Sequence, residues 1–296
     1  VGKRLKFTHD KIHESSYALW PKDKRTQRHA LIAKYMLKTL DEATIDTEIF
    51  SIVEHLNYSS DTVTDVQQRI EIAQYNFRAG MKAKQSSAFE PAVEFFQQGK
   101  RYLDESIWQQ QPEFAFDLHF SLAQTAYTTA RFELSEDIIK QCMAHEQDQI
   151  KITPVVQLYQ DLLFASSRHD EGIAFALNKL NEYGLSLPAT PGKLSVLIEY
   201  LRLKFRQRLR TTQSLIELPK TTDKKRLSMM AIIANMVPSC YMVNGDLMGF
   251  ISLRMARLSL KYGNNSYSSF GYAMTGLVET GILKRIESGR KYYDLS

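Results

Sequence analysis

Two histidines near the amino terminus have a spacing that could support zinc chemistry. His9 and His13 stand four residues apart with Asp10 directly after the first, which is the spacing of zinc ligands on a metalloprotease helix. A catalytic zinc also needs a third protein ligand. Asp10 is one carbon shorter than the usual glutamate, and no third ligand follows at a convincing spacing. We therefore expect surface or interface histidines here, and keep a zinc-dependent hydrolase as an alternative.

Other short motifs could move phosphoryl groups, but each is incomplete. His13-Glu14 and His145-Glu146 place an acid after a histidine, without the following Arg and Pro of a phosphoaccepting histidine motif. A phosphate-binding loop needs an earlier glycine and a serine or threonine after its lysine. Neither condition is met at Gly2-Lys3, Gly99-Lys100 and Gly192-Lys193. The sequence therefore predicts no catalytic, cofactor-binding or metal-binding residues.

The densest positive charge lies between residues 202 and 210. We name Arg202, Arg206, Arg208 and Arg210 as candidate partner-binding residues, because such a cluster could bind phosphate or an acidic partner. On a helix these charges point around more than one face, which favours a solvated basic surface over a binding site. Leu201, Phe205 and Leu209 recur every fourth residue and predict a buried stripe on the same helix.

The elements that must position these residues are helices with a recurring pattern. A small, a large apolar and a second small residue recur on one helical face, which lets a neighbouring helix approach closely. The four copies of this stripe are Ala92/Phe96/Gly99, Ser135/Ile139/Cys142, Gly249/Leu253/Ala256 and Gly289/Tyr293/Ser296. The pattern predicts an all-α, right-handed α-α superhelix of tetratricopeptide-like helical repeats.

The offsets between the copies support true repeats. Gly80 precedes Ala92 by the same distance that separates Ala123 from Ser135, and both landmarks shift by 43 residues. A third, weaker unit follows after 37 residues, at Gly172. The stripe then fails near Arg210, where we predict a degenerate or replaced unit. The fourth copy ends on the last residue, which predicts an array cut in mid-repeat.

The sequence before the array predicts a separate helical segment. Alternation over residues 1–7 indicates a short strand, and helices follow over residues 9–20, from Asp23, and over residues 46–57. Polar residues at 58–65 predict a joint. We therefore divide the chain into a helical segment at 1–60 and a repeat array at 61–296.

Composition indicates an ordinary soluble globular protein. Hydrophobic residues make up 44% of the 296 positions, and the formal net charge is +5, a modest excess that does not require a nucleic-acid partner. Cys142 and Cys240 sit in apolar helical patterns and predict reduced, buried thiols. No window is apolar enough for a membrane span. We expect a cytoplasmic protein without membrane insertion.

Several segments, taken in the order in which they occur along the chain, carry a resemblance to a known protein family. They are residues 7–21, 49–57, 78–84, 218–223, 254–265 and 269–273, with Arg25, His29 and Ile32-Ala33 between the first two. In this order they resemble the helical region that follows the nucleotide-binding module of large multidomain bacterial signalling ATPases. These are predictive-ATPase proteins of the STAND type, which carry sensor histidine kinase and often serine/threonine kinase and GAF modules.

The resemblance indicates where such a region lies within the longer proteins, and it implies no activity for the region itself. The ATPase core, with its winged-helix part closing near Phe7, would precede this region, and the sensor and kinase modules would follow it. No catalytic residue of the family falls in this chain, so ATP and magnesium are expected only in the upstream module. The resemblance and the repeats together predict a non-catalytic scaffold or sensor region of a signal-transduction ATPase/histidine kinase.

The expected binding partners follow from that prediction. We expect a protein or interdomain partner that regulates output, and a small-molecule inducer is compatible with it. The main rival is a nucleic-acid-binding regulatory region of a repeat-containing transcription regulator, which steep salt dependence of DNA or RNA affinity would reveal.

Overall fold

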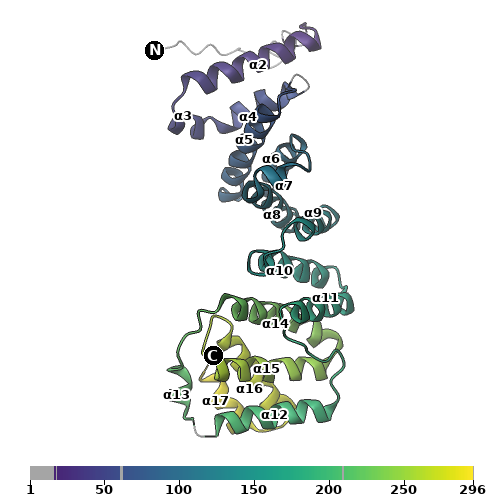
Figure 1. Ribbon diagram of the computed structural model, residues 1–296, viewed down its shortest axis with the longest axis vertical. Coiled ribbons are helices and arrows are strands. Elements are labelled where there is room, and N and C mark those ends of the chain that lie inside the picture. Colours follow the sequence, from purple (N-terminus) through teal and green to yellow (C-terminus); the bar gives the residue numbers. More distant parts are fainter. Residues whose placement is uncertain (1–16, 18, 61–62, 209, 296) are drawn as a thin grey trace. The chain divides into compact units, whose positions relative to one another are not determined.

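The structure, a computed structural model, describes residue 17 and residues 19–60, 63–208 and 210–295. Within these ranges every regular element is a helix, and the extended backbone pairs only in an isolated bridge between Lys220 and Asn264. The prediction of an all-α chain is confirmed (Figure 1). The chain forms two compact units, residues 1–138 and 139–296. The strand predicted at 1–7 and most of the helix predicted at 9–20 lie outside the described residues.

The first unit begins with three helices, α2 (Lys22–Thr39), α3 (Glu42–Thr47) and α4 (Ile49–Tyr58). Asp41 caps α3, because its side chain accepts a hydrogen bond from the backbone N–H of Thr44 at 2.8 Å. The predicted inward face of α4 is confirmed, since four apolar side chains on it are buried: Ile49, Ile52, Val53 and Leu56. They share one core with Ala33 of α2.

The first repeat pair consists of α5 (Val66–Gln85) and α6 (Phe89–Arg101). Gly80 of α5 lies so close to the ring of Phe96 that an added methyl group would overlap it. The predicted burial of the first stripe is confirmed, because Ala92, Phe96 and Gly99 are all buried. A small residue on one helix and an aromatic ring on the next bring the two helices into close contact.

The next helices are α7 (Ile107–Gln110), α8 (Pro112–Thr128) and α9 (Phe132–His145). The second stripe is also confirmed, because Ser135, Ile139 and Cys142 are fully buried. The Ser135 hydroxyl donates to the carbonyl oxygen of Ala123 on α8 at 2.9 Å. A small polar residue thus replaces alanine at this close contact while its hydroxyl stays hydrogen-bonded.

Three helix pairs share one turn geometry, which supports the predicted period. The third pair is α10 (Gln149–Ala165) and α11 (His169–Glu182). In all three pairs a three-residue link has a central residue in the left-handed region: Ser87 (φ 59°), Ala130 (φ 56°) and Ser167 (φ 56°). These residues are separated by 43 and 37 residues, the offsets read from the sequence. The residue after each one donates to a carbonyl five residues earlier, which closes the helix end.

The irregular interval of the array has a structural explanation in the second unit. It contains α12 (Lys193–Gln207), the short α13 (Thr212–Ile216), α14 (Lys224–Val243) and α15 (Gly245–Tyr262). α14 packs directly against α10 and α11, while α12 packs against α15 (Figure 1). The predicted degenerate unit is therefore not inserted between its sequence neighbours. Helix α12 instead covers the far side of α15.

The last described elements are α16 (Ser268–Leu277), a π-helical turn η2 (Val278–Ile282) and α17 (Ile286–Tyr293). The third stripe, Gly249/Leu253/Ala256, is buried as predicted. The fourth is confirmed only at Gly289, which lies against Thr280 and the backbone of Gly276. Tyr293 is 43% exposed, although its ring lies against Gly276. Ser296 lies outside the described residues.

Among the described helices, α14 alone has the length and apolarity of a membrane span, and half of its most apolar stretch is buried inside the protein. Its neighbours α10, α11 and α15 cover that buried part. A core helix of a globular protein can be as long and as apolar as a membrane-spanning helix. Cys240 on α14 and Cys142 on α9 are buried free thiols, as the sequence predicts.

Candidate partner-binding face and basic pocket

Helix α12 contains two of the four candidate arginines, Arg202 and Arg206, and the other two follow its end. A buried carboxylate pairs this helix with α15. Helix α11 ends at Glu182, and a non-helical link that contains Pro188 and Pro191 leads to α12, which runs from Lys193 to Gln207. Its inner side presents Glu199, Tyr200 and Leu203, all buried. Tyr200 and Leu203 join a core with Leu253 of α15.

Glu199 forms ion pairs with two arginines of α15. Its Oε1 lies 2.6 Å from Nε of Arg257 and 2.8 Å from Nε of Arg254. Arg202 of α12 is 3.8 Å from the other carboxylate oxygen. Burial lowers the pKa of the Arg254 guanidinium, and the charge of Glu199 opposes that shift. These charges hold α12 against α15 in one register.

The four predicted arginines do not form a single site. Arg202 is directed toward Glu199. Arg206 is exposed and contributes to a lowered pKa of Tyr262, after the hydrogen bond from Lys261 that is the main cause. The guanidinium of Arg208 stacks on the ring of Phe205, 3.9 Å from its centroid. Only Arg208 and Arg210 line a common pocket.

The stripe predicted to be buried on this helix is exposed, and that prediction is wrong. Leu201 is 56% and Phe205 is 64% exposed, while Leu209 lies outside the described residues. The reason is that α12 buries its opposite side against α15. Five large apolar side chains therefore form what we call the α12 outer face: Leu194, Leu197, Ile198, Leu201 and Phe205.

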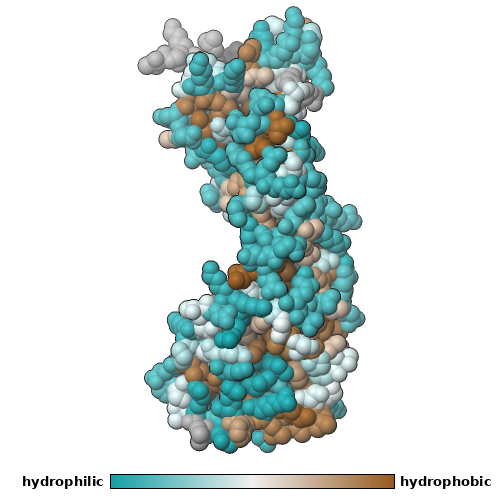
Figure 2. Space-filling view, in the orientation of Figure 1, coloured by the Kyte–Doolittle hydropathy of each residue, from teal (hydrophilic) through white to brown (hydrophobic). Residues whose placement is uncertain are grey.

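The spacing of these five residues places them on one side of the helix. Figure 2 shows hydrophobic surface at the lower edge of the second unit, where Figure 1 places α12. Single exposed apolar residues are normal on proteins, but a contiguous patch usually marks an interaction site. Lys193, Arg202 and Arg206 are exposed on the same helix and add positive charge to this surface.

A basic pocket lies beside this helix, where α12 meets α17. It has a volume of about 470 Å³ and is lined by eight residues: Lys204, Gln207, Arg208, Arg210, Thr211, Ser288, Lys291 and Tyr292. Lys204 Nζ donates to Ser288 Oγ at 3.0 Å and lies 3.4 Å from the Tyr292 hydroxyl. The Tyr292 hydroxyl donates to Gln207 Oε1 at 2.5 Å. These bonds tie the two walls of the pocket together.

A second buried carboxylate lies beneath this pocket. The π-helical turn η2 includes Glu279, which is fully buried and whose Oε1 lies 2.5 Å from Lys204 Nζ. The Tyr200 hydroxyl approaches Glu279 Oε2 at 3.4 Å and accepts a hydrogen bond from Arg285 at 2.9 Å. Burial raises the pKa of Tyr292, and the nearby Glu279 adds to that effect, so Tyr292 stays a neutral phenol.

Sequence reasoning missed half of this pocket. Lys204 lies inside the cluster that the sequence singled out, but Ser288, Lys291 and Tyr292 are more than 80 residues away from Lys204. Nothing in a single sequence indicates that α12 and α17 meet. The only signal for this pocket in the sequence was the excess of lysine and arginine in the last turns of α12 and α17.

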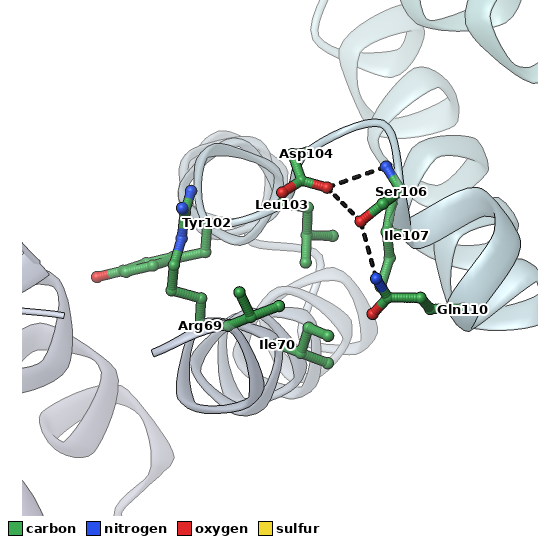
Figure 3. Close-up of a pocket in the computed structure, with 9 residues that line it drawn as sticks. Arg69, Ile70, Tyr102, Leu103, Asp104, Ser106, Ile107 and Gln110 are labelled. Carbon is green, nitrogen blue, oxygen red and sulfur yellow. Dashed lines mark hydrogen bonds between the residues drawn. The ribbon is translucent and has the colours of Figure 1, made fainter. Parts of the chain in front are cut away.

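One other cavity is too small to hold a ligand. The pocket under the turn between α6 and α7 holds only about 10 Å³, which is space for one water molecule at most (Figure 3). There, Asp104 accepts hydrogen bonds from the backbone N–H of Ser106 at 2.9 Å and from its hydroxyl at 2.5 Å. The arrangement is a turn motif that starts α7.

The histidine motifs give no support for metal or phosphoryl chemistry. His9 and His13 lie outside the described residues, and His145 is exposed at the end of α9. In the part of the chain that the structure describes, no three His, Cys, Asp or Glu side chains come together as metal ligands would.

Comparison with known proteins gives one informative match. No protein-family model matches the chain, and no solved structure matches it. The chain is similar to hybrid signal transduction histidine kinase G of Dictyostelium discoideum, with 20% identity over 324 residues. It is similar to a signalling protein. The match covers 93% of this chain but only 9% of that kinase, so it concerns a small part of a much longer protein.

Proposed function

We propose that this chain is a non-catalytic helical-repeat scaffold region of a multidomain signal-transduction protein of the histidine kinase type. The α12 outer face would bind a partner or flanking domain, and its occupancy would regulate the output of the whole protein. The similarity to a hybrid histidine kinase over 93% of the chain supports the signalling role. A STAND-type ATPase module upstream and the tetratricopeptide type of the repeats are part of the same proposal.

The observation that supports docking most directly is the α12 outer face. A helix with apolar residues on two opposite sides normally lies inside a core. α12 buries one of these sides against α15 and leaves five large apolar side chains in solvent on the other. Burying such side chains stabilises a complex by about 1.5–3 kcal/mol each at most, before the cost of association.

The surface around these residues indicates the chemistry of the partner. Arginines and a lysine flank the apolar stripe, and Arg208 stacks on Phe205. Aromatic and arginine side chains are the residues that most often dominate binding energy. A complementary partner would be an amphipathic helix with apolar residues every three to four positions and carboxylates beside them.

A site-specific photocrosslinker in the full-length protein tests this proposal. It would be placed at Phe205 and, as a control, at Met242, an equally exposed apolar residue of α14. Mass spectrometry should identify an acidic amphipathic segment attached at position 205 and not at 242. Replacing Leu197 and Leu201 by glutamate should abolish that product. Identical products from both positions, or nucleic acid attached at 205, would overturn the proposal.

A further inference from the structure

The basic pocket between α12 and α17 has a strong imbalance of charge. Four of the eight described residues that line it are cationic and none is acidic. The buried Glu279 pairs with Lys204 from beneath, which leaves Arg208, Arg210 and Lys291 as the positive charges on the rim. Like charges that line one pocket repel one another, and a bound anion would relieve that repulsion.

We propose that this pocket binds a small phosphorylated ligand, a compound of sugar-phosphate size with at least one phosphomonoester group. A phosphomonoester bears close to two negative charges at neutral pH and offers three acceptor oxygens. The pocket supplies guanidinium groups, which bind phosphate with two parallel hydrogen bonds, and an ammonium group as a point charge. Ser288 and Thr211 add hydroxyl donors.

The pocket is held in place before any ligand arrives. Lys204 is fixed by Glu279 at 2.5 Å and by Ser288 at 3.0 Å, and its ammonium lies 4.9 Å from the Tyr292 ring centroid. Tyr292 is buried and hydrogen-bonded to Gln207 across the pocket. Ordering these side chains therefore costs little on binding, which favours affinity for a small ligand.

Size and lining favour a small polar compound. The volume of about 470 Å³ falls within the range of small-molecule sites, and it exceeds what a bare phosphate needs. The aromatic ring that lines the pocket, Tyr292, is buried and offers no open face on which a nucleobase could stack. The remaining space is lined by hydroxyl, amide and charged groups, which suit the hydroxyls of a sugar.

Binding to the purified full chain can be measured by calorimetry with glucose 6-phosphate and inorganic phosphate. AMP, a phosphoserine peptide and potassium chloride at matched ionic strength serve as comparisons. We expect saturable binding of glucose 6-phosphate. The double variant Arg210→Gln/Lys291→Gln should weaken it about tenfold or more, through the loss of two charge-assisted contacts. Both residues are exposed, so thermal unfolding should show that this variant folds.

Arg290→Gln is the matched control, because Arg290 is an exposed neighbour of Lys291 on α17 that does not line the pocket. It should leave the Kd unchanged, and Lys291→Arg should restore binding. Equal weakening by Arg290→Gln, or no saturable binding of either phosphate probe, would overturn the proposal. Binding of the phosphopeptide alone would also overturn it. Crosslinking from Phe205 does not depend on these residues, so the two proposals fail separately.

Discussion

Glu199 on α12 and Arg257 on α15 form a buried ion pair, with 2.6 Å between Oε1 and Nε. The carboxylate is fully buried and also contacts Arg254 at 2.8 Å. These contacts fix the side of α12 that faces the core, and therefore also the side that faces solvent. Glu199 is buried on the same side of α12 as Tyr200 and Leu203, and the α12 outer face is the opposite side.

Replacing Glu199 by glutamine should destabilise the second unit by about 3 kcal/mol or more, because two partly buried arginines lose their counter-charge. Denaturant unfolding followed by circular dichroism measures this loss. Glu171→Gln is a suitable control, since Glu171 is exposed in its pair with Arg168 and such surface pairs contribute about 1 kcal/mol or less. Equal effects of the two variants would show that the buried pair does not stabilise the α12–α15 contact.

Gly80→Ala should destabilise the first unit by about 1–3 kcal/mol, because the new methyl group would overlap the ring of Phe96. The same change at Gly245 meets no atom within 4 Å and should be close to neutral. Adding Phe96→Leu to Gly80→Ala should recover part of the loss, and a double-mutant cycle measures that coupling. If the two substitutions changed the free energy of unfolding additively, that result would contradict the close contact between Gly80 and Phe96.

The first unit should lose stability in mild acid because of a histidine pair. Nδ1 of His29 on α2 lies 2.6 Å from Nδ1 of His55 on α4. Burial lowers the pKa of both rings below their ordinary 6.5, and the charge of His55 adds to the shift of His29. Arg25 acts in the same direction on His29, while Glu54 opposes the shift of both.

As the pH falls below about 6.5, the unfolded chain takes up protons that the folded histidines resist, so the free energy of unfolding decreases. Above that pH the pair is neutral in both states and the effect is absent. Urea unfolding between pH 7.5 and about 5 measures this difference. His55→Gln should flatten the profile, whereas His145→Gln, at an exposed position, should preserve it.

Both thiols should be unreactive in the folded protein. Burial raises the pKa of Cys142 and of Cys240 to about 12, so almost no thiolate forms at neutral pH. Labelling by iodoacetamide should therefore be slow in buffer and rapid in urea, as mass spectrometry can follow. Rapid labelling of either residue without denaturant would indicate local opening of its helix.

The sequence by itself determined that the chain is helical, the inward faces of α4 and α6, and the period of the first repeats. Helical spacing and capping residues are local properties, which explains why residues 66–85 match α5 and why Ala92, Phe96 and Gly99 are buried. It gave no sign of the shared turn, because Ser87, Ala130 and Ser167 adopt a conformation that glycine or asparagine usually occupies. The division into units at 1–60 and 61–296 stays a prediction.

Only the tertiary structure decided which side of α12 is buried and what meets its end. Both sides of that helix are apolar, so hydrophobic periodicity cannot choose between them, and the sequence prediction selected the exposed one. The choice depends on Arg254 and Arg257, more than 50 residues away, which pair with Glu199. The basic pocket likewise needs α17 beside α12, a long-range contact that no local pattern encodes.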